Sequence, residues 1–278
     1  KLNVPVNGVQ ITTPFEKLEA EGGKYEEIKN ATKAGVDIKT DVTNDSDTEA
    51  TGVSVKSTVY NKEGDVVSTQ TDDITVAAGK TETISQSVDV ANPKLWSVDS
   101  PNLYWVRTEI IQNGKVVDRT DSRFGIRYIA TNPNSGFYLN GVHTKLNGVC
   151  EHSDLGSLGM ETYQAAVDRR IRTLKKYGVN AIRTSHNPVS PEFIEACDRL
   201  GMLVFEEAFD QWLYSKNSDD YHNYFNKAAD GKTVVFDKAG NDNTNNDTSY
   251  IEVKREDLQS NAERDIKAMV DRDKNAPC

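Results

Sequence analysis

Three groups of polar residues carry the side chains of this sequence that could do chemistry. Each group follows a short apolar run. If the runs are parallel strands, their carboxyl ends lie at one edge of a sheet, and the polar side chains converge there. Imidazoles, carboxylates and an amide gathered in this way are typical of an acid–base or ligand-binding site. The candidates are His152 and Asp154 after the first run, Arg183, His186 and Asn187 after the second, and Glu206, Glu207 and Asp210 after the third.

Each candidate also has a purely structural explanation. A histidine at a strand end is most often a hydrogen-bonded structural residue. Arg183 could bridge neighbouring carboxylates, and we favour this supporting role for it. Glu206 and Glu207 are neighbours on one strand, so alternation could turn one side chain inward and the other outward. We assign Glu206 a role in supporting the substrate-binding residues. The two histidines with Asp154 lack helical i, i+4 spacing and any known ligand motif, so we expect no metal and no cofactor.

The second group sits between a buried strand and a helix. Val179–Ile182 is the apolar run that predicts the strand. Pro188 ends it. The sequence Ser190-Pro191-Glu192 then predicts a helix start, because it supplies a cap, a proline at the first helical position and an acid in the first turn.

The chain from residue 128 onward predicts three strand–helix units in a parallel sheet with right-handed crossovers. Strands are expected at 144–150, 179–183 and 202–205, and the second and third helices at 191–200 and 255–270. An open doubly wound sheet and a (β/α)₈ barrel both fit, but a Gly-rich phosphate loop is absent, which counts against a dinucleotide fold. A complete barrel has eight such units and ~250 residues, so a segment with three units would be less than half of one. The apolar faces are Tyr163, Val167, Ile171 and Leu174, then Phe193, Ile194 and Cys197, then Leu258, Ala262, Ile266 and Met269.

Residues 1–127 predict a β-sandwich of immunoglobulin type. Val36–Val42 and Val53–Val59 alternate apolar and polar residues, and further strands are expected at 74–76, 83–90 and 104–111, separated by turn residues. Trp96 and Trp105 are candidates for its core. We therefore expect two domains, 1–127 and 128–278, with residues 129–133 as the linker.

Composition excludes some classes of partner. The 278 residues carry a net charge of −10, which argues against nucleic acid and anionic membrane surfaces. An apolar run of the ~20 residues that cross a bilayer is absent from the sequence. Cys150, Cys197 and Cys278 show no zinc-like spacing, and we expect the first two to be reduced core residues. The compartment stays open, and the start at Lys1 suggests a segment of a longer protein.

The stretch NAIRTSHNP at 180–188 resembles the first signature of glycoside hydrolase family 2, the β-galactosidases and β-glucuronidases. That pattern usually has Tyr where this chain has Asn187. Residues 93–104 and 123–127 resemble the end of the sandwich that precedes the family's catalytic barrel. Residues 146–154 resemble its first barrel strand, with Ser153 where a second histidine is frequent, and 206–210 resemble its Asp-Glu-Ala pattern, with Glu206 replacing Asp.

The resemblance implies a retaining β-glycosidase whose sugar pocket includes His152, Asp154 and His186, with Asn187, Glu207 and Asp210 as further substrate-binding residues. Retaining hydrolysis needs two carboxylates. In the family these follow on the fourth and seventh strands, beyond Cys278, while 273–278 resemble the opening of the second signature, with Ala276 where His is common. We therefore expect a fragment that is inactive alone. Its third strand would need a second copy of the chain or the missing part of the barrel as a partner.

Residues 208–254 are too long for a plain loop. Their aromatic residues either stack on sugar rings or form a surface cluster of their own, and the Asn/Asp-rich run at 241–247 favours disorder or simple solvation. The aromatic residues are Trp212, Tyr214, Tyr221, His222, Tyr224 and Phe225.

Two other classes of protein are alternatives. A non-catalytic carbohydrate-binding or scaffolding protein would use the two domains as they stand. A natural stop at Cys278 would favour it, and a longer gene product would exclude it. An unrelated α/β hydrolase or metal enzyme would need a nucleophile elbow or a ligand motif, neither of which we find in the sequence.

Overall fold

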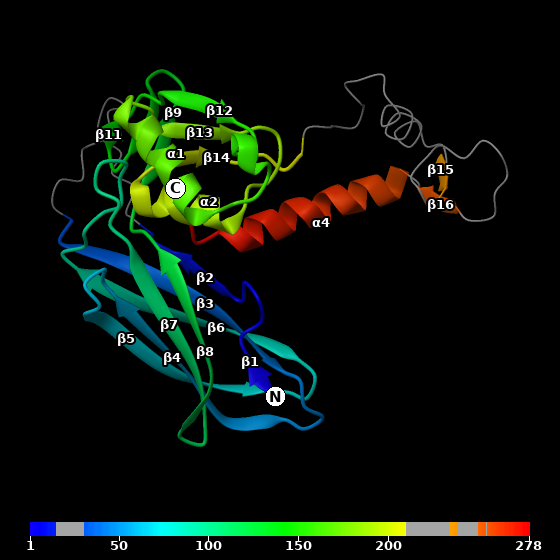
Figure 1. Cartoon of the computed structure of the whole chain (residues 1–278). Helices are drawn as coiled ribbons and strands as arrows, with labels where there is room; N and C mark the ends of the chain where they lie inside the picture. Colours follow the sequence, from blue (N-terminus) through cyan, green and yellow to red (C-terminus); the bar gives the residue numbers. More distant parts are fainter. Residues whose placement is uncertain (15–30, 210–233, 238–249, 254) are drawn as a thin grey trace.

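The computed structural model describes residues 1–14, 31–209, 234–237, 250–253 and 255–278, and it confirms the sandwich (Figure 1). One sheet joins β1, β2 and β6 to β3, and the other has the order β5-β4-β7-β8. Val36 and Val55 are fully buried between the sheets, as the alternation predicts. The strands are β1 (Leu2–Asn3), β2 (Val9–Thr12), β3 (Lys33–Asn44), β4 (Ala50–Tyr60), β5 (Val66–Val76), β6 (Thr81–Ala91), β7 (Tyr104–Gln112) and β8 (Lys115–Phe124).

The second half contains the predicted parallel strand–helix units. The strand order is β12-β13-β14, with α1 and α2 as the crossovers. The elements are β12 (Gly148–Glu151), the short 3-10 helix η1 (Gly156–Leu158), α1 (Gln164–Lys176), β13 (Ala181–Thr184), α2 (Pro191–Leu200), β14 (Leu203–Phe205) and α4 (Arg255–Asp273). The structure also contains two small antiparallel sheets. They are β9 (Ile129–Asn132), β10 (Gly136–Leu139) and β11 (Val142–His143), and β15 (Val234–Asp237) with β16 (Tyr250–Val253).

Strand pairing changes along the chain after β8. β8 pairs with β7, β9–β11 pair among themselves, and β12 pairs with β13. The boundary at residue 127 itself stays a prediction. In the described part of the chain, helices that combine bilayer-spanning length with sufficient apolar character are absent.

Helix α2 forms where its capping residues predict it. The Ser190 hydroxyl accepts a hydrogen bond from the backbone N–H of Phe193 at 3.3 Å, and Pro191 opens the helix. Gly201 ends it with φ of 75°, a conformation that glycine adopts without strain. Phe193, Ile194 and Cys197 are buried, which confirms the predicted inner face.

Three local predictions were wrong. The strand expected at 144–150 begins only at Gly148, because the segment before it bonds to the Asn180 side chain through the N–H of Asn147 and the carbonyl of Lys145. Tyr163 precedes α1 as its cap residue and is 56% exposed, so it does not belong to the buried stripe of Val167 and Ile171. Cys150 is exposed, not in the core.

The pairing register of the parallel sheet explains the position of Cys150. Val149, Ile182 and Val204 lie in register on one face and pack against the helices. Cys150 pairs with Arg183, which pairs with Phe205, so these three lie in one row on the opposite face. Phe205 in this row is 70% exposed. The row below it, which contains Ala181 and Leu203, packs against Trp96, Leu103 and Leu139.

Trp96 is fully buried, but it belongs to the junction of the two halves and not to the core of the sandwich. Its indole N–H donates to the backbone carbonyl of Asp198 in α2 at 2.8 Å. The Asp198 carboxylate accepts two hydrogen bonds from Arg123 of β8, at 2.7 and 3.0 Å, and one from the backbone of Cys278. Burial raises the pKa of this carboxyl, and Arg123 opposes the rise. Trp105 is only partly buried beside this junction.

The last residues of the chain lie along the sandwich. The Asn275 side chain accepts from the backbone N–H of Ile11 and donates to the carbonyl of Val9, both at 2.8 Å, as a neighbouring strand would. Lys274 donates to the carbonyl of Asn7 at 2.7 Å. Pro277 packs so closely on Gly125 that a Cβ there would lie 2.6 Å from the proline Cβ. The segment therefore connects the barrel part to the sandwich.

Helix α4 confirms the predicted third helix, but not its buried stripe. Figure 1 shows it running away from the body of the molecule toward β15 and β16. Ile266 is 43% exposed, and the neighbouring Val270 is 52% exposed. Ile266 and Val270 of α4 are therefore exposed, whereas Met269 is half-buried.

Candidate active site

The structure brings the two predicted histidines together. His152 directly follows the end of β12, and His186 follows β13 by two residues, so both lie at the carboxyl edge of the sheet. Their ring centroids are 5.7 Å apart and the rings are nearly perpendicular, at 87°. Two imidazoles at this separation can contact one small ligand.

Glu207, two residues after β14, holds His186 together with Arg183. Its Oε2 lies 2.9 Å from His186 Nδ1, and its Oε1 accepts from Arg183 Nε at 2.6 Å. Arg183 Nη2 lies 3.2 Å from the same Nδ1. Arg183, and to a smaller extent His186, lowers the pKa of the Glu207 carboxyl. Glu207 in turn raises the pKa of the Arg183 guanidinium. Among the described residues, Arg183 contacts the single carboxylate of Glu207, and its supporting role stays a prediction.

Glu206 points to the other side of the strand end, as alternation predicts. Its Oε1 accepts from the backbone N–H of Val189 at 3.2 Å and from Arg272 at 3.0 Å. Burial raises its pKa to about 7, and the negative charge of Asp273 adds to the rise. Glu206 therefore joins the loop after β13 to the end of α4, and it is turned away from the histidines.

The remaining candidates do not join this cluster. The Asp154 side chain is 62% exposed, lies 3.9 Å from Arg170 of α1, and accepts from the backbone N–H of Gly156. Asn187 is exposed, and its side chain has no hydrogen-bond partner among the described residues. Asp210 lies outside the described residues, as do the aromatic residues from Trp212 to Phe225. The substrate-binding roles of all six candidates stay predictions.

Two residues of the cluster were missed by the sequence reasoning. Cys150 Sγ lies 3.6 Å from Arg183 Nη1, and the buried hydroxyl of Thr184 accepts from the backbone N–H of Glu207 at 3.0 Å. In the sequence, the alternation of Val149 and Cys150 indicates that the two side chains lie on opposite faces of the sheet. Only the pairing register shows that the face with Cys150 is the open one. Among the described residues, the structure contains no cluster of three metal-ligating side chains.

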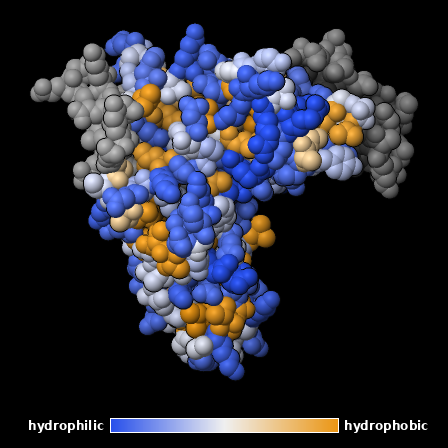
Figure 2. All heavy atoms as spheres, turned by 60° about the vertical axis from the view of Figure 1, so that its left-hand side comes forward, coloured by the Kyte–Doolittle hydropathy of each residue, from blue (hydrophilic) through white to orange (hydrophobic). Residues whose placement is uncertain are grey.

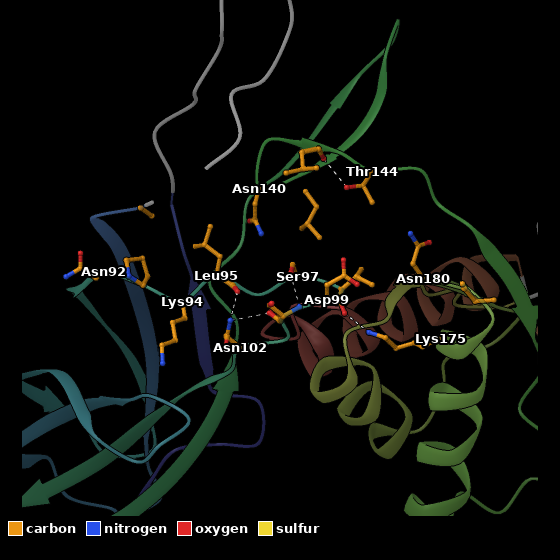
Figure 3. Close-up of a pocket in the computed structure, with 18 of the residues that line it drawn as sticks. Asn92, Lys94, Leu95, Ser97, Asp99, Asn102, Asn140, Thr144, Lys175 and Asn180 are labelled. Atoms are coloured by element: carbon orange, nitrogen blue, oxygen red, sulfur yellow. Dashed lines mark hydrogen bonds between the residues drawn. The ribbon is translucent and has the colours of Figure 1, made fainter. Parts of the chain in front are cut away.

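A hollow that these histidines do not line lies where the sandwich meets the barrel part (Figure 3). Its volume is about 810 Å³, and it is lined by the 92–102 loop, the β10–β11 hairpin and the end of α1. Two of its polar side chains are already hydrogen-bonded to backbone carbonyls. Lys175 donates to the carbonyls of Leu200 and Gly201 at 2.7 and 2.9 Å, and burial lowers its pKa. Asn102 donates to the carbonyl of Leu95 at 3.0 Å. This hollow has the character of a domain junction.

A sandwich followed by parallel strand–helix units with a polar carboxyl edge is the arrangement expected of a β-sandwich joined to the opening part of a (β/α)₈ barrel. The model of "Glycosyl hydrolases family 2" matches residues 24–127, and that of "Glycosyl hydrolases family 2, TIM barrel domain" matches residues 131–278. The chain belongs to glycoside hydrolase family 2. The predicted family and fold are thereby confirmed.

The relatives are longer than this chain. A β-galactosidase of Bacteroides ovatus is 40% identical over 195 residues, which are 70% of this chain and 23% of that protein. A putative β-glucuronidase of Formosa agariphila is 43% identical over 137 residues, 49% of this chain and 13% of that protein. The crystal structure of a family 2 member from Bacteroides cellulosilyticus matches with a TM-score of 0.76 and 32% identity, over 99% of this chain and 30% of that one. The matched part of this chain spans 13–30% of the lengths of these three proteins.

Proposed function

We propose that this chain is the sandwich and the opening part of the barrel of a retaining β-glycosidase that removes a terminal sugar, with β-galactosides as the first substrates to test. The observation that carries the proposal is the pair of histidines at the carboxyl edge of the parallel strands, with ring centroids 5.7 Å apart. Ligand sites of barrel enzymes lie at this edge. Membership of family 2 supports the hydrolytic reaction.

In this proposal the chain shapes the sugar pocket, and other residues supply the two reacting carboxylates. A retaining glycosidase places its acid/base and its nucleophile about 5–5.5 Å apart, on either side of the glycosidic bond. Glu206 and Glu207 come from one strand end, and their carboxylates bond to partners in opposite directions. They cannot flank one bond, so the residues described here bind and orient the sugar.

The choice of a galactoside rests on the relatives. The Bacteroides ovatus relative is named a β-galactosidase, whereas others are named β-glucuronidases. A panel of chromogenic β-galactoside and β-glucuronide substrates distinguishes the two specificities directly.

The test of the pocket is kinetic and uses the longer protein that contains this chain. His186→Ala should lower kcat/KM by about 100- to 1,000-fold, which corresponds to about 2.7–4 kcal/mol of lost transition-state stabilisation, the range measured when one oxyanion-hole group is removed. His143→Ala is the matched control, since His143 lies in the β10–β11 hairpin and packs on Tyr138. An unchanged rate for His186→Ala would make His186 a structural residue.

A further inference from the structure

His186 Nδ1 has two neighbours that require opposite protonation states. A carboxylate can only accept a hydrogen bond, so Glu207 Oε2 at 2.9 Å requires a proton on Nδ1. A guanidinium can only donate, so Arg183 Nη2 at 3.2 Å requires a bare Nδ1. One ring nitrogen can satisfy only one of them in the neutral histidine.

The geometry favours Glu207. It is closer to Nδ1 than Arg183 is, and the arginine has other partners. Arg183 Nε donates to Glu207 Oε1 at 2.6 Å, and Nη1 lies 3.6 Å from Cys150 Sγ. The backbone of Glu207 is also fixed, since its N–H donates to the hydroxyl of Thr184. The carboxylate therefore has one preferred place, with one oxygen on each neighbour.

We propose that Glu207 is a positioning residue that fixes the proton of His186 on Nδ1, so that Nε2 presents a lone pair to the ligand. Among the described residues, none bonds to Nε2. His186 then binds a sugar hydroxyl by accepting a hydrogen bond from it. This role rests on the proposed function, in which His186 contacts the sugar. Arg183 and His186 each bond to one oxygen of Glu207, which fits a supporting position for this carboxylate.

Ring tautomers can be read in this chain without any activity. The sequence contains only four histidines, so ¹⁵N-histidine labelling gives a simple spectrum. At about pH 8, above the ordinary histidine pKa of about 6.5, two-bond ¹H–¹⁵N correlations distinguish a protonated ring nitrogen from a bare one. We expect His186 to show a protonated Nδ1 and a bare Nε2. A bare Nδ1, or protons on both nitrogens, would overturn the proposal.

Three variants separate the two neighbours. Glu207→Ala leaves only the donor Arg183 beside Nδ1, so the proton should move to Nε2. Arg183→Met removes the competing donor, and Nδ1 should keep its proton. Glu206→Gln changes the adjacent carboxylate, which does not contact His186, and is the matched control with an unchanged tautomer. An unchanged tautomer in Glu207→Ala would show that Glu207 does not set it. If that variant fails to fold, the native chain and Arg183→Met still decide the point.

Binding to the longer protein tests the hydroxyl contact. A fluorine in place of a hydroxyl accepts hydrogen bonds but cannot donate one. In a panel of monofluorinated galactosides, fluorine at one position should weaken competitive inhibition. The loss should be at least as large as that of the deoxy sugar, which lacks the hydroxyl at the same position. Tolerance of fluorine at every position would contradict the accepting role. If His186 carries its proton on Nδ1 but the longer protein has no glycosidase activity, the proposed function fails. The assignment of Glu207 as the residue that fixes the tautomer then still holds.

Discussion

Neighbouring carboxylates at one strand end have opposite electrostatic environments in this protein. Glu207 lies against Arg183, which lowers its pKa, whereas burial and Asp273 raise the pKa of Glu206. Strand alternation alone predicts that the two side chains diverge. The partners could not be predicted, because Arg272 lies 66 residues from Glu206 along the chain.

The raised pKa of Glu206 gives a stability that depends on pH. The unfolded chain releases this proton near the ordinary value of 4.5, and the folded chain retains it up to about 7. Between these values the folded chain binds more protons, so its stability falls as the pH rises. Glu206→Gln removes this loss. From about pH 5 to about pH 8, its free energy of unfolding should gain about 1–2 kcal/mol relative to the native chain.

Urea unfolding at the two pH values measures this gain, and Glu207→Gln is the control. The pKa of Glu207 is lowered, so its ionised form stabilises the fold above its ordinary pKa, and its loss should destabilise the chain at neutral pH. A Glu206→Gln variant that shows the same difference from the native chain at both pH values would refute the assignment.

At the scale of elements, local signals predicted α2 well, whereas positions fixed by distant partners were missed. The cap at Ser190, the proline and Gly201 fix the ends of α2 within the sequence itself. Trp96 bonds to a residue 102 positions away, so its burial was predictable but its place at the junction was not. Cys150 was misplaced for the same reason, because only the pairing register with Arg183 shows that its face is open.

Asn275 connects the barrel part to the sandwich through two backbone hydrogen bonds to β2. Asn275→Ala leaves the N–H of Ile11 and the carbonyl of Val9 without these partners, and should lower the free energy of unfolding by about 1–3 kcal/mol. The amide of Ile11 should also exchange faster with solvent. Asn187→Ala is the control, since that side chain is exposed and unbonded among the described residues. Equal stability and equal exchange in both variants would contradict the connecting role.

At the scale of the whole molecule, the described sheet has open edges and uncovered apolar side chains. β12 and β14 each pair on one side only within the described residues, and Phe205 is 70% exposed. Figure 2 shows separate apolar patches on an otherwise hydrophilic surface, over both the sandwich and the barrel part. Open strand edges of this kind favour pairing with other chains.

The isolated chain should therefore self-associate. In sedimentation velocity its apparent mass should rise above the 30.9 kDa of one chain as the concentration increases. Phe205→Glu should reduce this association by placing a charge beside the edge of β14. Val66→Glu changes an apolar residue of the sandwich that is 59% exposed and should leave the association unchanged. A chain that stays monomeric throughout would remove the open edge as an association site.

The central claim is that this chain shapes a sugar pocket whose reacting carboxylates lie elsewhere in a longer glycosidase. Turnover of a chromogenic β-galactoside, measured on the 278-residue chain and on the longer protein, tests it most directly. Because proton transfer and attack on the anomeric carbon are the chemical steps themselves, positioning residues cannot replace those carboxylates. We predict turnover by the longer protein and none by the chain. Turnover by the chain that survives both Glu206→Gln and Glu207→Gln, or none by the longer protein on any β-glycoside, would contradict the claim.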